Sequence, residues 1–416
     1  MRVATRGPDL ADLDRRVFEV LDRHLAKGEA RPVAVALSGG GDSLALTLLA
    51  AAWAKAAGRP LLVLSVDHGL QPQSAAWTKA CAARAAALGA DFRALRWVGP
   101  KAARGLPAAA RAARHALLAD AARAAGARVI LMGHTADDIL EARAMRVEGA
   151  TTPEPRVWAP SPAWPEGRDV FLLRPLLGLR RGEIRDWLEA RDERWIDDPA
   201  NDDPRSARTR ARQGLPADAA APELIAPGRP GALAEACRMD EAGVLSVPRG
   251  AFRAGSPDQA AGFIGIACLC AAGTSRPPAV AEALRLAWRL SSQADVTATL
   301  SGARIEADAG EVRFLREAGE TARGGLAPLR ITAGQTAVWD GRFEIAADRD
   351  LTVRPLAGVA AQLGDADRAS LAAIAPKARQ ALPVAVEGDD VRRLAARPLA
   401  LARLRAACGL VEREPA

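Results

Sequence analysis

Residues 31–147 alternate between two patterns of apolar and polar positions. Short apolar runs predict β-strands at 32–37, 61–67, 91–97 and 128–133. Between them, longer alanine-rich amphipathic stretches predict helices at 43–57, 74–88, 106–125 and 136–147, and a leading helix is expected at 9–26. Strands that alternate with helices are typical of a parallel sheet covered by helices on both faces. We therefore expect an α/β fold for this part of the chain.

Proline and glycine divide the rest of the chain. Five prolines within 151–168 predict an irregular segment, followed by a short strand and turn at 171–177 and a helix at 180–191. The Pro/Ala/Gly-rich stretch 214–231 is the best linker candidate. Beyond it, a helical pattern over 231–290 gives way to β-like runs at 298–305, 312–315 and 336–346. In the last run, Asp340-Gly341 is a strong hairpin-turn signal.

Length and composition fit this division. A chain of 416 residues is too long for one compact core, so we expect three domains, 1–213, 230–295 and 296–416. Hydrophobic residues at 49% and charged residues at 26% exclude a mainly disordered or fibrous protein. The sequence shows no apolar stretch of membrane-spanning length and no signal-peptide core, so a cytoplasmic protein without a membrane partner is expected. It favours no oligomeric state.

Charge and cysteine usage add little by themselves. The net charge of +7 permits a polyanionic partner, but nearly all basic residues are arginines, and a GC-rich genome explains that bias equally simply. The five cysteines form no CxxC pair and no cluster with histidine. Reduced, mostly buried thiols are therefore expected.

The sharpest chemical feature is Ser38-Gly39-Gly40-Gly41-Asp42-Ser43, which lies between a predicted strand and a predicted helix. Glycines let the backbone approach an anion, and the free amides of a helix start point toward it, so the segment predicts a phosphate cradle. It lacks the Lys of a Walker A loop and the spacing of a dinucleotide-binding turn. An acidic residue beside phosphates requires a cation between them, and Mg²⁺ bound to Asp42 would supply it.

At this loop the sequence resembles the PP-loop ATP pyrophosphatases. Four further segments follow in order: Val66-Asp67-His68-Gly69-Leu70, Ala110-Arg111-Ala112-Ala113-Arg114, 133–141 (GHTADDILE) and 195–201 (WIDDPAN). The ordered set is similar to the tRNA(Ile)-lysidine synthetases and covers about 31–212. The resemblance implies a PP-loop ATP-binding catalytic domain at 1–213, a helical tRNA-contacting domain at 230–295 and a small mixed, β-rich domain at 296–416.

The resemblance also implies a ligase that uses ATP and Mg²⁺ to join free L-lysine to the wobble cytidine of a tRNA(Ile) with a CAU anticodon. Catalytic roles fall to Asp42, Asp138 and Glu141, the last two of which would bind the lysine ammonium. The ATP-binding set would be Ser38, Gly39, Gly40, Gly41, Asp42, Ser43, Asp67, Arg111, Arg114 and His134, with Asp42 as the metal ligand. The tRNA-binding set would be Asn201, Arg205, Arg208 and Arg212.

Each residue type also has a plain structural interpretation. The residues alone favour neither turn capping nor ligand binding for Asp67. Arg111 and Arg114 share a helix face and could grip a triphosphate, although spacing alone favours a solvated face. The same holds for the arginines after residue 201. Carboxylates at a helix start often only offset the helix dipole, but a cluster beside a phosphate site exceeds that need.

Three alternatives stay open at this stage. A PP-loop tRNA thiolase or an amidotransferase-like nucleotide synthetase would share the loop, although neither catalytic cysteines nor a glutaminase segment is visible. A non-catalytic tRNA-binding protein is the third alternative. It is suggested by Ile139 and Ala142, which stand where members of the resembled family often have Gln and Thr; Thr135 likewise stands where they often have His.

Overall fold

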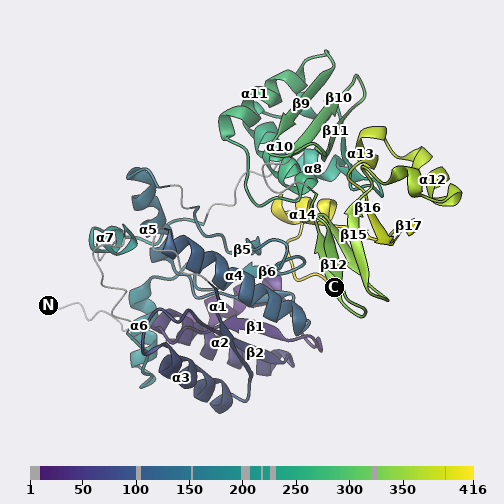
Figure 1. Cartoon of the computed structure of the whole chain (residues 1–416). Helices are drawn as coiled ribbons and strands as arrows, with labels where there is room; N and C mark the ends of the chain where they lie inside the picture. Colours follow the sequence, from purple (N-terminus) through teal and green to yellow (C-terminus); the bar gives the residue numbers. More distant parts are fainter. Residues whose placement is uncertain are drawn as a thin grey trace. The chain divides into compact units, whose positions relative to one another are not determined.

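The computed structural model describes residues 10–99, 105–150, 153–197, 207–216, 219–224, 231–320, 326–388 and 390–416. Contacts between residues divide the chain into two compact units, Met1–Ala226 with Val411–Ala416, and Pro227–Leu410 (Figure 1). Within the described residues, no helix is both long and apolar enough to cross a membrane.

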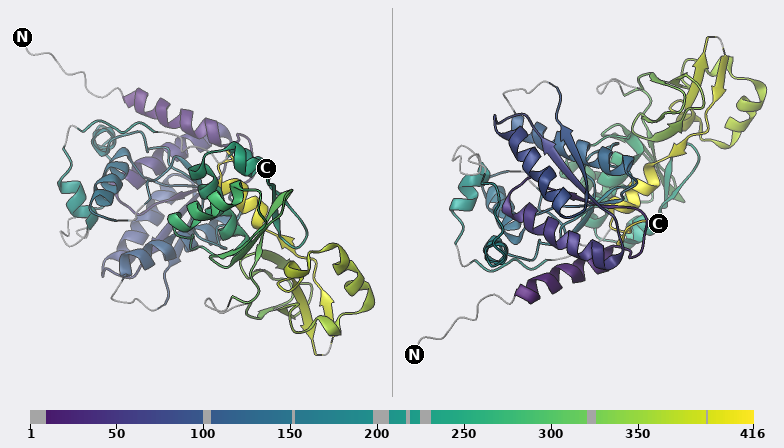
Figure 2. Two further views of the ribbon diagram at one scale, coloured as in Figure 1. Left: turned by 90° about the horizontal axis from the view of Figure 1, so that it is seen from above. Right: turned by 90° about the horizontal axis from the view of Figure 1, so that it is seen from below.

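The first unit consists of a six-stranded sheet with helices on both faces (Figures 1 and 2). Its elements in chain order are α1 (Leu10–His24), β1 (Val33–Ala36), α2 (Gly41–Ala57), β2 (Leu61–Asp67), α3 (Ser74–Ala87), β3 (Asp91–Arg96), α4 (Leu106–Ala124), β4 (Val129–Leu131), α5 (Ala136–Val147), β5 (Trp158–Pro160), β6 (Phe171–Leu173), α6 (Arg181–Glu189) and α7 (Ala207–Gln213). The expected parallel α/β fold is confirmed. The segment expected to be irregular contains the short strand β5.

The strand order is β3-β2-β1-β4-β6-β5, and every pair is parallel except β5 with β6. From β1 the chain first builds outward through β2 and β3, and then returns to place β4 on the other side of β1. The carboxyl ends of β1 and β4 therefore lie side by side at the point where the strand order reverses. Open α/β sheets bind ligands at such a point.

Alternate residues of the central strands face opposite layers of helices. Val33 and Val35 of β1 lie in one core with side chains of α1, α2 and α6, whereas Ala34 lies in a second core with Leu118 of α4. Burial on both faces explains why these strands read as continuous apolar runs rather than as an alternation of apolar and polar residues.

The second unit is a set of antiparallel sheets with helices. Its elements are α8 (Gly231–Ala236), β7 (Arg238–Met239), β8 (Leu245–Pro248), α9 (Ala251–Ala254), α10 (Pro257–Ala272), α11 (Val280–Ser291), β9 (Val296–Leu300), β10 (Ala303–Ala307), β11 (Glu311–Arg316), β12 (Leu329–Ile331), β13 (Thr336–Trp339), β14 (Phe343–Ala346), β15 (Leu351–Pro355), η2 (Ala360–Gln362), α12 (Asp365–Ser370), η3 (Leu371–Ala373), α13 (Pro376–Arg379), β16 (Pro383–Glu387), β17 (Asp390–Arg393), β18 (Arg397–Pro398) and α14 (Ala400–Ala407). The sheets have the orders β7-β8-β11-β10-β9, β12-β15-β16-β17 and β13-β14-β18.

The second unit differs in three places from the sequence expectation. Phe263 of α10 and Phe314 of β11 share one core, so the expected boundary at 295/296 lies inside that core. The run expected as a single strand at 298–305 is the hairpin β9–β10, because Ser301 and Gly302 adopt positive φ and reverse the chain. The short strands β7 and β8 lie within 231–290, which was expected to be helical.

The hairpin expected at Asp340-Gly341 is confirmed. Both residues have positive φ, and the Arg342 amide donates to the Trp339 carbonyl at 3.0 Å. Positive φ at both central positions is the geometry of the turn that best matches the twist of paired strands. The turn joins β13 to β14 in antiparallel register.

The final segment, Val411–Ala416, belongs to the first unit. Glu414 and Arg59 form an ion pair of 2.9 Å in which both side chains are almost fully buried. The Trp158 indole donates to the Val411 carbonyl at 2.6 Å, and the Glu414 amide donates to the His24 carbonyl at 2.8 Å. The chain thus leaves this unit near residue 226 and returns to complete its packing.

Candidate active site

The loop between β1 and α2 is fixed by its glycines and by Ser43. Gly39 has φ +92°, and a Cβ atom at this residue would lie 2.6 Å from Ile196 Cδ1, so no other residue fits without a shift. Ser43 Oγ donates to the Gly40 carbonyl at 2.9 Å and accepts from the Ser38 amide at 3.2 Å. Because α2 begins at Gly41, its first amides have no partner within the helix and are available to an anion.

The end of β4 approaches this loop closely. A Cβ atom on Gly133 would lie 3.0 Å from both N and Cα of Ser43, so any other residue would require the backbone of the two segments to move apart. The chain then turns at His134 and enters α5, which carries the expected carboxylates. The two loops at the reversal point of the sheet therefore lie against each other.

The start of α5 orients two neighbouring carboxylates differently. Asp138 accepts from the Thr135 amide at 2.7 Å and the Thr135 hydroxyl at 3.1 Å, and its side chain is 9% exposed. Asp137 instead accepts two hydrogen bonds from the Arg180 guanidinium, at 2.9 and 3.1 Å. Asp137 thus fastens α5 to α6, while Asp138 faces the site. Thr135 is the residue that holds Asp138 in place.

Glu141 is the most buried acidic residue of the site, with 1% of its side chain exposed. It accepts hydrogen bonds from Arg181 at 3.2 Å, from Arg208 at 2.6 Å and from Arg212 at 2.9 Å. Arg208 also contacts Asp138. The structure therefore brings together the expected carboxylates and two of the expected arginines.

Arg181 connects the phosphate loop to the carboxylates. Its Nε donates to Asp42 at 3.2 Å, while its Nη1 reaches Glu141. Burial raises the pKa of Asp42, and Arg181 opposes this shift. Burial alone would lower the pKa of Arg181, but Asp42, Glu141 and Asp138 together raise it. Arg181 therefore stays charged and fixed between the two halves of the site.

Sequence reasoning missed Arg181, although a signal was present. Arg180 precedes α6 and Arg181 is its first residue. Cations at a helix N-terminus oppose the helix dipole. Such a placement requires nearby carboxylates, which α2 and α5 supply through Asp42, Asp137 and Glu141.

The side of the site next to His134 is cationic. The Arg174 guanidinium donates to His134 Nδ1 at 3.1 Å, so the imidazole is neutral there. Burial and then the charge of Arg174 hold the pKa of His134 well below its usual range. Burial also lowers the pKa of Arg114 and of Arg174 to about 10, with the charge of Arg111 as the next cause for both. Mutually repelling guanidiniums attract a polyanion such as a triphosphate.

One nitrogen atom of Arg114 also points to an anionic ligand. Its Nε atom is buried and has no hydrogen-bond partner among the described residues. A buried donor without an acceptor is costly, and an anionic oxygen would relieve that cost. Arg111 is exposed one turn earlier on α4. The expected pairing of both residues with a triphosphate therefore stays a prediction that this geometry favours.

The remaining expected site residues are Asp67, Asn201 and Arg205. Asp67 caps a turn, since its Oδ1 accepts from the Gly69 amide at 2.7 Å. Asn201 and Arg205 lie outside the described residues. Ile139 and Ala142, where members of the resembled family often have polar residues, are both buried.

His115 on α4 gives the first unit a specific pH dependence. Burial, together with Arg114 and Arg111, lowers the pKa of His115 to about 3. In the unfolded chain its pKa returns to about 6.5. Between these values the unfolded chain binds a proton that the folded chain does not, so stability falls as the pH decreases from about 6.5 toward 3.

We expect His115→Gln to make the free energy of unfolding depend less steeply on pH below about 6.5. Urea unfolding at a series of pH values, followed by tryptophan fluorescence, measures this slope. An unchanged slope in the variant would show that His115 does not contribute to the acid sensitivity. The reverse sign, with the native protein gaining stability on acidification through this residue, would contradict the burial argument.

The comparisons with known proteins agree with this geometry. A sequence profile described as the PP-loop domain matches residues 13–218. The tRNA(Ile)-lysidine synthase of Caulobacter vibrioides is 48% identical over 415 residues, covering 96% of this chain and 98% of the relative. That of Hyphomonas neptunium is 36% identical, covering 82% of this chain and 95% of the relative. The chain belongs to the tRNA(Ile)-lysidine synthase family. The resemblance predicted from the ordered motifs is thereby confirmed.

Among solved structures, the U34-tRNA thiolase NcsA of Methanococcus maripaludis with its [4Fe-4S] cluster is similar at a TM-score of 0.40 and 18% identity, covering 49% of this chain and 71% of that chain.

Proposed function

We propose that this protein ligates lysine to the wobble cytidine of a tRNA(Ile) with a CAU anticodon, at the expense of ATP. The cytidine O2 attacks the α phosphorus and pyrophosphate leaves. The ε-amine of lysine then attacks C2, and AMP departs with the former O2, leaving lysidine. The observation that carries the proposal is that Arg181 contacts both Asp42 beside the phosphate loop and the buried carboxylates of Asp138 and Glu141. The chain also belongs to the family whose members are named for this reaction.

The nucleotide half of the reaction needs a cradle for phosphates. The first amides of α2 bind the phosphate oxygens, and Arg111, Arg114 and Arg174 stabilise their charge from the side of α4 and β6. His134 is neutral, so it can donate from Nε2 without adding charge.

Mg²⁺ fits the donor set at this position. Among the described residues, no cluster of three or more metal-ligating side chains occurs. Mg²⁺ needs none, because it is usually held by one or two carboxylates together with substrate phosphates and water. Asp42 would hold the ion through the carboxylate oxygen that Arg181 does not contact. Held there, Mg²⁺ would supply positive charge to offset the charge that develops on the leaving pyrophosphate.

The lysine half of the reaction falls to Asp138 and Glu141. A buried carboxylate pair selects a cationic amino acid, because a neutral analogue would leave the pair unneutralised. The amine must also lose a proton before it attacks C2. Asp138, whose Oδ2 is held by Thr135, is positioned to accept that proton.

The chemistry of the cysteines disfavours the thiolase alternative. All five cysteines are buried free thiols. Burial raises the pKa of Cys237 to about 11 and that of Cys268, Cys270 and Cys408 to about 12. Sulfur transfer requires a reactive thiolate or a cluster ligand. Buried thiols with raised pKa values supply neither.

The decisive test is mass analysis of the tRNA product. Minor tRNA(Ile) transcript is incubated with the full chain, ATP, Mg²⁺ and isotopically labelled lysine, and then digested to nucleosides. We expect a cytidine that has gained one labelled lysine and lost one water, together with AMP and pyrophosphate. A protein that binds ATP and tRNA but yields no such nucleoside would instead be a non-catalytic tRNA-binding member of the fold.

A further inference from the structure

The pair of carboxylates assigned to lysine is already occupied by cations of the chain itself. Arg208 contacts both Glu141 and Asp138, and Arg212 donates to the second oxygen of Glu141. Arg181 donates to the same oxygen of Glu141 as Arg212 does, and it also holds Asp42. Three guanidiniums thus neutralise three carboxylates. An incoming ammonium would leave an excess positive charge in a buried site, unless one arginine withdraws.

The arginines differ in how firmly they are held. Arg181 is 15% exposed at the start of α6 and bridges two other elements, so it belongs to the framework. Arg208 is 39% exposed and Arg212 is 35% exposed. Both project from α7, a helix of seven residues in which only Thr209 and Ala211 are buried. The ion pairs of Arg208 and Arg212 therefore hold α7 on the carboxylates together with the buried side chains of Thr209 and Ala211.

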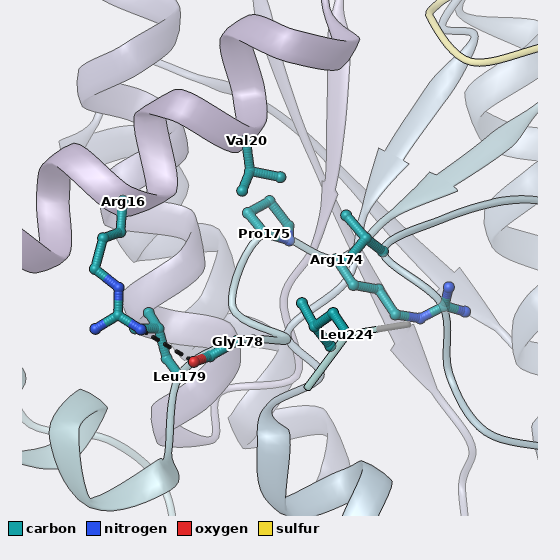
Figure 3. A pocket seen from close by; sticks show the side chains of 8 residues that line it. Arg16, Val20, Arg174, Pro175, Gly178, Leu179 and Leu224 are labelled. Carbon is teal, nitrogen blue, oxygen red and sulfur yellow. Dashed lines mark hydrogen bonds between the residues drawn. The ribbon is translucent and has the colours of Figure 1, made fainter. Parts of the chain in front are cut away.

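The chain on both sides of α7 contacts the first unit independently of these ion pairs. Before the helix, the Ile196 amide donates to the Gly39 carbonyl at 3.0 Å. After it, the side chain of Leu224 lines a small cavity with Val20 of α1 and Pro175 (Figure 3). The chain on either side of α7 thus has its own contacts with the first unit, which do not depend on the ion pairs of Arg208 and Arg212.

We propose that Arg208 is an internal competitor of lysine for the Asp138–Glu141 pair. When tRNA phosphates draw α7 away, Arg208 leaves this pair of carboxylates. Lysine therefore enters after tRNA has docked. The inference rests on the proposed function. A guanidinium matches phosphate as well as carboxylate geometry, so the same side chain has a second partner when RNA arrives. Because the competitor is tethered, its effective concentration is high, on the order of millimolar. Lysine binding and tRNA binding are then positively coupled, and the coupling is reciprocal.

The experiment measures this coupling rather than lysine affinity alone. Equilibrium dialysis with radiolabelled lysine is performed on the full chain without ATP, so that no turnover occurs, in the absence and presence of saturating tRNA. For the native protein we expect tRNA to strengthen lysine binding by about tenfold or more, within the usual range of coupling between two sites. Arg208→Met should bind lysine tightly without tRNA and show little further change when tRNA is added.

Two matched variants separate the competitor from a simple charge effect. Arg143→Met removes a guanidinium from α5 that pairs with Glu154 rather than with the site, and should keep the native coupling. Arg208→Lys keeps the charge but not the forked contact, so its coupling should be intermediate. Its charge-conserving change also provides a check if Arg208→Met fails to fold.

Several outcomes would overturn the inference. If tRNA leaves lysine affinity unchanged in the native protein, or if Arg208→Met responds to tRNA by the native factor, Arg208 is not a competitor. When lysidine nevertheless forms in the product assay, the proposed function stands and only this inference falls. Absence of lysine binding under every condition, together with absence of lysidine, overturns both.

Discussion

Asp42→Asn is expected to reduce ATP-dependent pyrophosphate release by roughly 100- to 1,000-fold, the loss seen when one electrostatic contact to a developing charge is removed. The amide keeps the shape of the side chain but cannot hold Mg²⁺ against phosphates as a carboxylate does. It also cannot neutralise Arg181, which would still be held by Glu141. Release of pyrophosphate from ATP in the presence of tRNA measures this step directly.

The affinity for tRNA separates this role from general damage. Asp42 lies in the first turn of α2, whereas Arg208 and Arg212, the described arginines assigned to RNA, lie on α7, so tRNA affinity should stay near the native value. Asp120→Asn is a matched control, because Asp120 lies on α4 and pairs with Arg123 in an exposed contact. A variant at Asp42 that loses tRNA binding and pyrophosphate release to the same extent would contradict the assigned role.

The fold of the first unit could be predicted from the sequence because its signals are local. Helix α5 and strand β2 have the expected bounds, since apolar periodicity and the adjoining glycine or polar residues mark both ends. The hairpin β9–β10 was missed because Ser301-Gly302 is a weak turn signal inside a long β-like run. The Asp340-Gly341 turn was found because both residues favour positive φ.

The acidic half of the site could be predicted, but the partners of its carboxylates could not. Asp42, Asp138 and Glu141 follow or open elements whose order along the chain sets their place at the sheet edge. Arg181 reaches Asp42 across 139 residues of sequence, and Arg208 reaches Asp138 across 70. No periodicity encodes such contacts. The competition between Arg208 and lysine therefore became visible only with the coordinates.

Glu414→Gln should destabilise the first unit by about 3–5 kcal/mol, because it leaves the charge of Arg59 buried without a counter-charge. Both side chains are almost completely inaccessible. Arg59 retains hydrogen bonds to the carbonyls of Ala26 and Arg31, which satisfy its donors but not its charge. Urea unfolding followed by tryptophan fluorescence measures the loss, and Trp158, which donates to Val411, reports on the same segment.

A double-mutant cycle shows whether the loss comes from the pair itself. Arg59→Met combined with Glu414→Gln should cost less than the sum of the single changes, since the double variant leaves no unpaired buried charge. Arg413→Gln is the control, because Arg413 makes an exposed 3.4 Å contact to the Asp22 carbonyl. Strict additivity of the single changes would mean that Glu414 acts through its hydrogen bonds alone. A strong coupling would show that the charge of Glu414 stabilises the first unit by pairing with Arg59, although the chain leaves this unit near residue 226 and returns to it only at Val411.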